Sequence, residues 1–250
     1  MLYLVGLGLY DEQDIPLRGL HVLKKAEEIY VEFYTNLFSG SIEGIEALAG
    51  KRVEILKRED IEEHAEEILL KDSKERMVAL LVPGDPMVAT THSDLIIRAR
   101  KLGIETRIIH ASSIYSAVGE TGLQIYKFGK TTSLVFPERG YFPTTPYETL
   151  RENLERDLHT LFLFDIKLTI PQGIQILLRI EKERKEDVFG EETLCVGIAR
   201  LGADNSTIRT GSAKEIMRLD FGSPPHALVV PGKLHFMEEE MLTSYRNWSE

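Results

Sequence analysis

Three short loops of glycine, proline and small polar residues follow apolar runs that are typical of strands. The clearest is Pro83-Gly84-Asp85-Pro86, which comes directly after Met77–Val82, the most hydrophobic run of the chain. Proline and glycine form a tight turn and let the backbone approach a ligand, and the aspartate adds a charged hydrogen-bond acceptor. Because ligands of open α/β sheets bind at the carboxyl ends of central strands, this loop is the first candidate for a binding site.

Two further loops have the same setting. Gly6-Leu7-Gly8-Leu9 and Ala111-Ser112-Ser113-Ile114 each follow a predicted strand. If the three strands belong to one sheet, the loops could converge on one cleft. On physical grounds alone, three ordinary turns between strands and helices are the alternative interpretation, since such turns occur in every α/β protein.

Two nucleotide-binding motifs are present only in part. The dinucleotide fingerprint that begins at Gly6-Leu7-Gly8 requires a third glycine where Asp11 stands. Gly129-Lys130-Thr131 is similar to the end of a phosphate-binding loop, but Gln124 stands where that loop requires its first glycine. The sequence therefore argues against ATP or GTP hydrolysis and favours nicotinamide binding only weakly.

Motifs for metal or nucleophilic chemistry are not found. The sequence has neither an HExxH nor a GxSxG motif, and its seven histidines are scattered. Its single cysteine, Cys195, lies in an apolar run and is predicted to be a core residue. We expect no metal site and no disulfide within the chain.

The first half of the chain alternates apolar runs with segments of helical period, a pattern typical of α/β proteins. Strands are predicted over residues 2–5, 29–34, 77–82 and 104–109, and helices over 15–29, 42–49, 93–102 and about 113–119. The run 77–82 is predicted to be a central parallel strand buried on both faces. The first helix is expected to bury Leu17, Leu20, Leu23 and Ala26.

The second half is richer in strands. Strands are predicted over residues 133–136, 160–166, 193–201 and 227–230, helices over 147–158 and 172–184, and a hairpin arm near 207–211. The acidic run 59–67 and the mixed run 181–187 are interpreted as solvated helix faces. The change in pattern predicts two α/β domains, 1–112 with the Pro-Gly-Asp-Pro loop and 113–250.

Composition restricts the class of protein. The chain has 250 residues, is 43% hydrophobic and carries a net charge of −10, which argues against non-specific nucleic-acid binding. Its uncharged apolar runs are shorter than the roughly 20 residues that span a bilayer, and its start lacks the basic region of a signal peptide. We expect a cytoplasmic protein with protein and small-molecule partners, and neither nucleic acid nor membrane among them.

Four segments, taken in order, resemble the diphthine synthases of the tetrapyrrole methylase (class III methyltransferase) superfamily. The glycine pair, the Pro-Gly-Asp-Pro loop and the serine pair match the superfamily, and the resemblance covers essentially all 250 residues. The four segments are MLYLVGLGLYDEQDI, LLVPGDPMVATTHSDL, ENLERDLHTLFLFDIK and GSPPHALVVPGKLHFMEEEML.

This resemblance implies two α/β domains of the tetrapyrrole methylase type, with S-adenosylmethionine in the cleft between them, and a homodimer. It implies repeated N-methylation of the 3-amino-3-carboxypropyl-histidine of translation elongation factor 2, giving diphthine in diphthamide biosynthesis, with S-adenosylhomocysteine as the other product. The compact chain favours the archaeal type, whose product is a trimethylammonium group.

Motif positions transfer a set of cofactor-binding residues from the family. The apolar members would contact adenine and the methionine chain, backbone groups would orient the cofactor, and Asp85 would accept hydrogen bonds or shape its loop. The set is Leu9, Asp85, Val88, Ser113, Ile114, Ile166, Leu201 and His226.

No catalytic residue is assigned, because methyl transfer needs chiefly an unprotonated amine aligned with the carbon–sulfur bond. Tyr10, His226 and the loop 138–147 are candidates for the mouth of the site, and Lys167 or Arg139 could bind the substrate carboxylate. The alternatives are a corrin or porphyrin methyltransferase and a non-catalytic nucleotide-binding module. Calorimetry with S-adenosylmethionine and with nicotinamide dinucleotides would separate the module from the enzymes.

Overall fold

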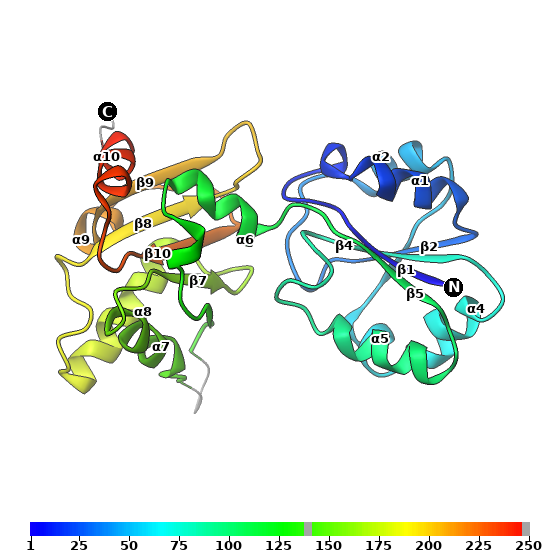
Figure 1. Ribbon diagram of the computed structural model, residues 1–250, viewed down its shortest axis with the longest axis horizontal. Helices are drawn as coiled ribbons and strands as arrows, with labels where there is room; N and C mark the ends of the chain where they lie inside the picture. The colour runs from blue at the N-terminus through cyan, green and yellow to red at the C-terminus, as the bar shows by residue number, and fades with distance from the viewer. Residues whose placement is uncertain (138–141, 247–250) are drawn as a thin grey trace. The chain divides into compact units, whose positions relative to one another are not determined.

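The computed structural model describes residues 1–137 and 142–246, and the chain divides into two compact units, Met1–Ala117 and Val118–Glu250 (Figure 1). Each unit is built on its own five-stranded sheet. The division follows residue 117, five residues beyond the boundary predicted after residue 112.

Unit 1, Met1–Ala117, holds a parallel sheet with the strand order β3-β2-β4-β1-β5. Every residue of β4 is buried, and β4 pairs with both β1 and β2, which confirms the predicted central strand. The strands are β1 Leu2–Gly6, β2 Glu28–Glu32, β3 Glu54–Leu56, β4 Val78–Val82 and β5 Thr106–Ile109.

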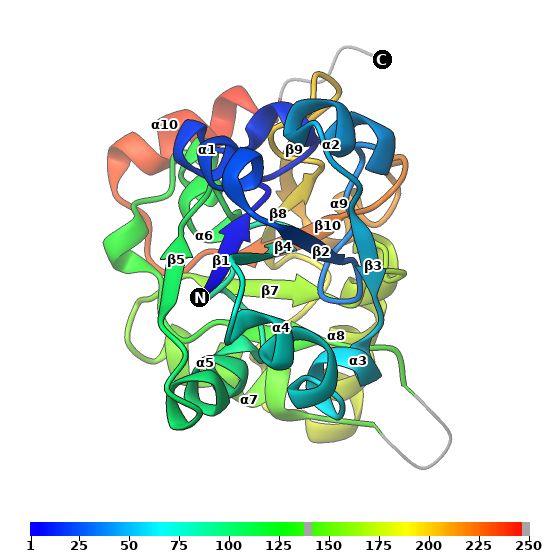
Figure 2. The same ribbon diagram turned by 90° about the vertical axis from the view of Figure 1, so that its right-hand side faces the viewer.

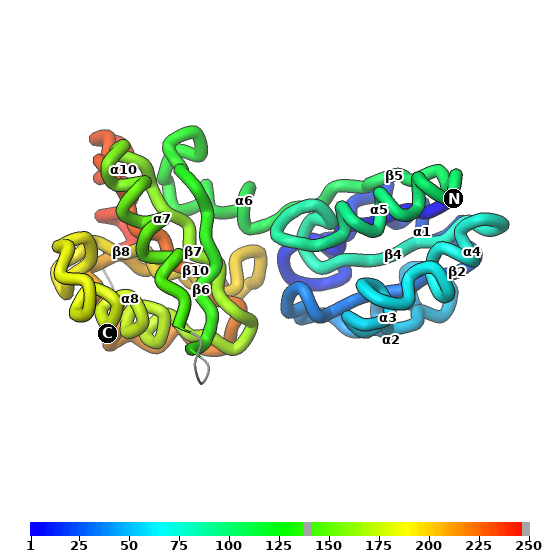
Figure 3. Tube along the Cα trace, turned by 90° about the horizontal axis from the view of Figure 1, so that it is seen from below, coloured from blue at the N-terminus to red at the C-terminus, as the bar shows by residue number. Residues whose placement is uncertain are grey.

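Helices cover both faces of this sheet. Alternate side chains of β4 enter two separate cores, Leu80 on one face and Leu81 on the other. Helices α1 and α2 cover one face of the sheet, and α3, α4 and α5 cover the other face (Figures 2 and 3). Their bounds are α1 Leu17–Lys25, α2 Ile42–Ala49, α3 Arg58–Glu62, α4 Lys71–Ser73 and α5 His92–Lys101.

Helix α1 differs from its prediction in length and in buried face. It ends at Lys25, and residues predicted to continue it belong to β2. Leu17 is 70% exposed, whereas Gly19 is buried, and a Cβ on Gly19 would lie 2.8 Å from Val5 Cγ1. The helix therefore approaches the sheet through a glycine, a contact that a count of apolar residues does not detect.

Unit 2, Val118–Glu250, holds a mixed sheet with the order β6-β7-β10-β8-β9, in which β6 and β7 are parallel and the other neighbouring strands are antiparallel. The predicted hairpin arm is β9, which pairs along all of β8. The strands are β6 Thr132–Leu134, β7 Thr160–Phe164, β8 Leu194–Ala199, β9 Thr207–Ser212 and β10 His226–Val230.

The core of unit 2 lies between its sheet and helices α7, α8 and α9 (Figure 1). Cys195 is fully buried in this core, and burial raises the pKa of its thiol, so the prediction of a core cysteine is confirmed. The helices are α7 Thr145–Leu154, α8 Ile170–Arg184, α9 Ala213–Ile216 and α10 Phe236–Ser244, and α10 was not predicted. Among the residues that the structure describes, no helix is long and apolar enough to cross a membrane.

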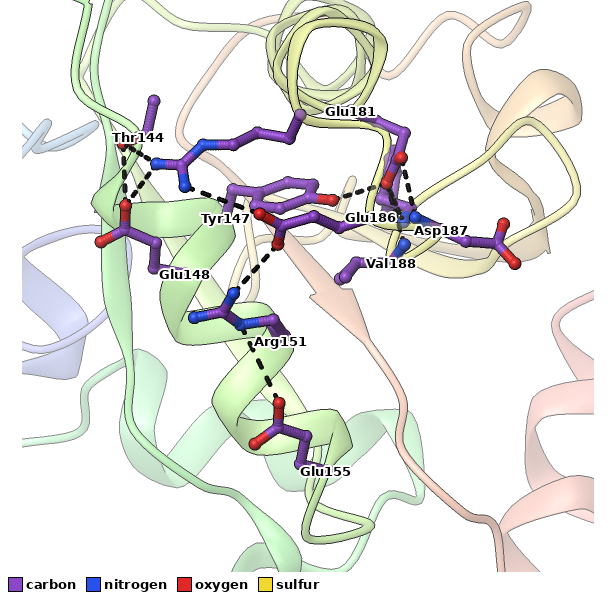
Figure 4. Close-up of polar contacts among 11 residues, drawn as sticks. Thr144, Tyr147, Glu148, Arg151, Glu155, Glu181, Glu186, Asp187 and Val188 are labelled. Carbon is purple, nitrogen blue, oxygen red and sulfur yellow. Dashed lines mark hydrogen bonds and ion pairs between the residues drawn. The ribbon is translucent and has the colours of Figure 1, made fainter.

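The interpretation of 181–187 as a solvated face is wrong for Glu181. Its carboxylate accepts a hydrogen bond from the Tyr147 hydroxyl at 2.6 Å and three from the backbone N–H groups of residues 187–189, at 2.8–3.0 Å (Figure 4). Burial raises the pKa of this carboxyl, but the hydrogen bonds outweigh burial and lower the pKa to about 2. Glu181 therefore joins α7 and α8 to the loop that follows α8.

Glu181→Gln is expected to lower the free energy of unfolding by roughly 1–3 kcal/mol, because an amide cannot accept all four hydrogen bonds. The pKa in the fold is below the ordinary 4.5, so the carboxylate stabilises the fold above about pH 4.5. That stabilisation is lost as the pH falls towards about 2. The midpoint of thermal unfolding of the variant should therefore lie below that of the wild type at pH 7, and the difference should be smaller at pH 3. Glu183→Gln, at an exposed ion pair with Arg179, is the control. An equal effect of both substitutions would contradict the role of Glu181.

Candidate functional site

The loops after β1 and β4 are joined through their backbones. The Gly8 N–H donates to the Gly84 carbonyl at 3.2 Å, and the Gly84 N–H donates to the Gly8 carbonyl at 2.8 Å. Both residues have positive φ, +86° at Gly8 and +72° at Gly84, which glycine adopts without strain. The two glycines therefore allow the loops to pair at the carboxyl ends of the two strands.

The loop after β5 meets them at Gly6. A Cβ on Gly6 would lie 2.6 Å from both Ala111 Cβ and the Gly84 carbonyl oxygen. A Cβ on Gly84 would lie 4.0 Å from Ser113 Cβ. The three loops singled out in the sequence thus converge at the carboxyl ends of the unit 1 strands. They lie so close together that no side chain fits at Gly6.

Asp85 organises this junction. Its Oδ1 accepts the Met87 N–H at 2.9 Å, and its Oδ2 accepts the Ala111 N–H at 3.2 Å and lies 2.8 Å from His110 Nδ1. The residue is only 6% exposed. Of the two roles considered for Asp85, these contacts support shaping of the loop.

A second polar pair, which the sequence analysis did not find, lies beneath the loop. His92, at the start of α5, is fully buried, and its Nδ1 lies 3.1 Å from the Pro86 carbonyl oxygen, which can accept a hydrogen bond from it. Its Nε2 lies 3.7 Å from Oε1 of Glu32, which is also buried and accepts the Tyr34 and Thr35 N–H groups. These contacts connect the loop after β4 to the end of β2.

The other residues predicted for unit 1 lie in the same loops. Leu9, Val88 and Ile114 are partly buried, and Ser113 is buried. The Ser113 carbonyl accepts the Ala117 N–H at 2.9 Å and so begins helix α6, Ile114–Ala117.

The three residues predicted for unit 2 lie at one end of three neighbouring strands of its sheet. Ile166 is in the turn after β7, Leu201 is in the turn after β8, and His226 is the first residue of β10. Because β10 is antiparallel to both neighbours, its start lies beside their ends, and His226 pairs with Ala199. Strands β7 and β8 end two residues before the predicted ends, so Ile166 and Leu201 lie in turns.

His226 carries an unpaired polar atom. Its Nδ1 accepts the Ile170 N–H at 3.4 Å, while its buried Nε2 makes no hydrogen bond within the described part of the chain. Burial lowers the pKa of this imidazole, and the nearby charge of Arg200 lowers it further. A neutral ring that accepts at Nδ1 carries its hydrogen on Nε2, so the unpaired atom is a donor.

The candidates for the mouth of the site are placed only in part. Tyr10 is partly buried, and its backbone N–H donates to Asp14 Oδ2 at 2.7 Å. Lys167 is exposed in the turn after β7. Arg139 and the first part of the loop 138–147 lie outside the described residues.

Comparison with known proteins identifies the family. Residues 1–217 match the family model described as Tetrapyrrole (Corrin/Porphyrin) Methylases. The chain belongs to the tetrapyrrole methylase family. It is therefore a methyltransferase, and the predicted family and fold class are confirmed.

Relatives within this methylase family carry a more specific name. A diphthine synthase of Methanocaldococcus jannaschii is 51% identical over 251 residues, which cover 97% of each chain. A diphthine synthase of Methanococcus maripaludis is 49% identical over 249 residues, again covering 97% of each. A crystal structure of diphthine synthase superposes with a TM-score of 0.90 at 40% identity, covering 98% of this chain and 95% of the other.

Proposed function

We propose that this methylase binds S-adenosylmethionine at the loops that meet at Gly6. The observation that carries the proposal is the backbone cradle itself, in which the loops after β1, β4 and β5 leave no room for a side chain at Gly6. Such a cradle at the carboxyl ends of parallel strands suits a small ligand that is recognised through main-chain groups.

The residues present fit the chemistry of this cofactor. The partly buried side chains of Leu9, Val88 and Ile114 are apolar, as contacts with adenine and the methionine chain require. In unit 2, His226 has a hydrogen-bond donor without a partner in the described residues. When bound, the sulfonium of the cofactor supplies an electrophilic methyl carbon. The contributions of Ile166, Leu201 and His226, and a cleft between the two domains, stay predictions that rest on the family resemblance.

The proposed acceptor is the 3-amino-3-carboxypropyl-histidine of translation elongation factor 2. Support comes from the diphthine synthases, at 51% and 49% identity over 97% of this chain. Repeated transfer to the amino nitrogen would give the trimethylammonium product diphthine, with S-adenosylhomocysteine released each time. A homodimer and a cytoplasmic location are further predictions from the resemblance.

Mass spectrometry of the elongation factor tests this function. The factor that carries the aminocarboxypropyl-histidine is incubated with the enzyme and isotopically labelled S-adenosylmethionine. Successive labelled methyl groups on that one residue are expected. A competent factor that gains no mass on this residue would reject the proposed acceptor.

Asp85→Ala is expected to weaken S-adenosylmethionine binding about tenfold or more, since it removes the contacts with His110 and the Ala111 N–H that join the loops after β4 and β5. Isothermal titration calorimetry measures the affinity, and circular dichroism checks the fold. Asp94→Ala, which removes an exposed carboxylate paired with Arg98 on α5, is the matched control and should bind as the wild type does. Unchanged affinity in a folded Asp85→Ala protein would refute the role of Asp85.

A further inference from the structure

His110 presents an imidazole at the junction of the three loops. It lies between Ile109, the last residue of β5, and Ala111, the residue that packs against Gly6. The side chain of His110 is 68% exposed, whereas that of its partner Asp85 is 7% exposed. A solvent-facing imidazole is thus held by a buried carboxylate at the edge where the cofactor is proposed to bind.

The contact with Asp85 determines which ring nitrogen is free. His110 Nδ1 lies 2.8 Å from Asp85 Oδ2, and a carboxylate only accepts hydrogen bonds, so Nδ1 carries a hydrogen. In the neutral ring, Nε2 then has the lone pair. The Met87 and Ala111 N–H groups hold the carboxylate in place, which fixes the orientation of the imidazole.

Among the described residues, no second charged side chain is recorded in contact with the His110 ring. Asp85 is the only charged or titratable side chain recorded in contact with His110 there. In unit 1, His92 is buried beneath the loop, and His21 and His64 lie in other segments, in α1 and just after α3. His110 is therefore the imidazole of unit 1 that combines exposure with a fixed tautomer at this edge.

We propose that His110 Nε2 is the general base that accepts a proton from the substrate ammonium before each methyl transfer. This inference rests on the proposed function, because it requires an amine as the acceptor of the methyl group. An α-amino group titrates near pH ~8 or above, so at neutral pH it is mostly protonated and has no lone pair for the attack. A positioned base contributes on the order of 10²–10⁴-fold to such reactions.

The proton and electron balance is complete without a further reactant. The N–H bond breaks as the proton passes to Nε2, and its electron pair becomes the lone pair of the amine. That pair forms the bond to the methyl carbon, while the electrons of the carbon–sulfur bond stay on sulfur. The proton on His110 passes to water before the next cycle. Three transfers to one nitrogen need three such proton removals, one before each transfer.

The test is the pH dependence of the first methyl transfer in His110→Asn. Asparagine can place an amide N–H near the position of Nδ1 and so keep the bond to Asp85, but it has no basic nitrogen. The variant must use amine that has already lost its proton to solvent. Its kcat/KM is expected to be about 10- to 100-fold below the wild type at pH 7 and within about threefold at pH 9. Its affinity for S-adenosylmethionine, measured by calorimetry, should stay within about threefold of the wild type.

Two further variants sharpen this test. Added imidazole should restore activity to His110→Ala, since it can replace the missing base. His21→Asn, which changes an exposed histidine on α1, should have the pH profile of the wild type. A His110→Asn deficit that is the same at pH 7 and pH 9, or no deficit at pH 7, would overturn the proposal. If the wild-type enzyme is active, either result leaves the proposed function standing, whereas a wild type that transfers no methyl group overturns both.

Discussion

Glu238→Gln is expected to lower the free energy of unfolding by roughly 3 kcal/mol, since it removes the buried charge of an ion pair and leaves some of its hydrogen-bond donors without an acceptor. Glu238 lies in the first turn of α10 and is fully buried. Its carboxylate forms an ion pair with Lys127 and accepts the Gln124 N–H at 2.9 Å and the His235 N–H at 2.7 Å. It also accepts a hydrogen bond from His159 Nε2 at 3.0 Å.

The substitution reaches beyond the ion pair because the partners of Glu238 form a chain. Burial lowers the pKa of His159, although the bond to Glu238 opposes this, and the His159 Nδ1 accepts the Gly232 N–H at 3.0 Å. A neutral imidazole that accepts the Gly232 N–H at Nδ1 carries its hydrogen on Nε2, and therefore needs an acceptor such as Glu238 there. Glutamine has a single acceptor oxygen, so at least one donor among these partners loses its hydrogen bond.

Thermal unfolding measures this effect. A loss of roughly 3 kcal/mol corresponds to a fall of about 6–12 °C in the unfolding midpoint of a chain of this size. Burial raises the pKa of Glu238, but the hydrogen bonds outweigh it and lower the pKa to about 2, below the ordinary 4.5. The carboxylate therefore stabilises the fold above about pH 4.5, and this contribution is lost as the pH falls towards about 2.

Glu239→Gln is the matched control, because Glu239 is the next residue of α10 and is exposed. It should change the free energy of unfolding by less than about 0.5 kcal/mol. If Glu238→Gln and Glu239→Gln have the same midpoint of thermal unfolding at pH 7, the hydrogen bonds and the ion pair of Glu238 do not stabilise unit 2.

Local sequence patterns were sufficient to predict the strand and the loop that position the candidate site. The apolar run at 77–82 predicted the central strand β4, and the loop after it lies where the rule for open sheets expects a ligand. Helix α2 matches its prediction in full, since a serine cap and a terminal glycine bound it. These predictions succeed because each depends on residues close together in the chain.

The contacts that sequence reasoning missed join residues far apart in the chain. Asp85 and His110 are 25 positions apart, and Glu238 and His159 are 79 apart. Single-sequence patterns do not report such pairs. Glu181 was misassigned because a charged residue in a charged run resembles a solvated one until its partners are known. The one signal that could have drawn attention to His110 was its position directly before the loop Ala111-Ser112-Ser113-Ile114.

Gly6→Ala is expected to lower the affinity for S-adenosylmethionine at least 100-fold, the largest effect expected on binding. The added Cβ would lie 2.6 Å from Ala111 Cβ and from the Gly84 carbonyl oxygen, which are parts of two different loops. One of these backbones must therefore move, and such overpacking also destabilises the fold by about 1–3 kcal/mol. Calorimetry with S-adenosylmethionine gives the affinity, and circular dichroism with thermal unfolding shows whether the variant is folded.

Two alanine variants separate the cradle from a general effect of an added methyl group. Gly190→Ala adds a Cβ with no atom within 4 Å, so its affinity and stability should be those of the wild type. Gly84→Ala has room for the Cβ, 4.0 Å from Ser113 Cβ, but its φ of +72° strains alanine by roughly 1–2 kcal/mol. This milder variant should fold and bind about tenfold more weakly. If both Gly6→Ala and Gly84→Ala fold and bind S-adenosylmethionine as the wild type does, the cofactor does not bind at these loops, because a ligand held by their backbones cannot be indifferent to their displacement.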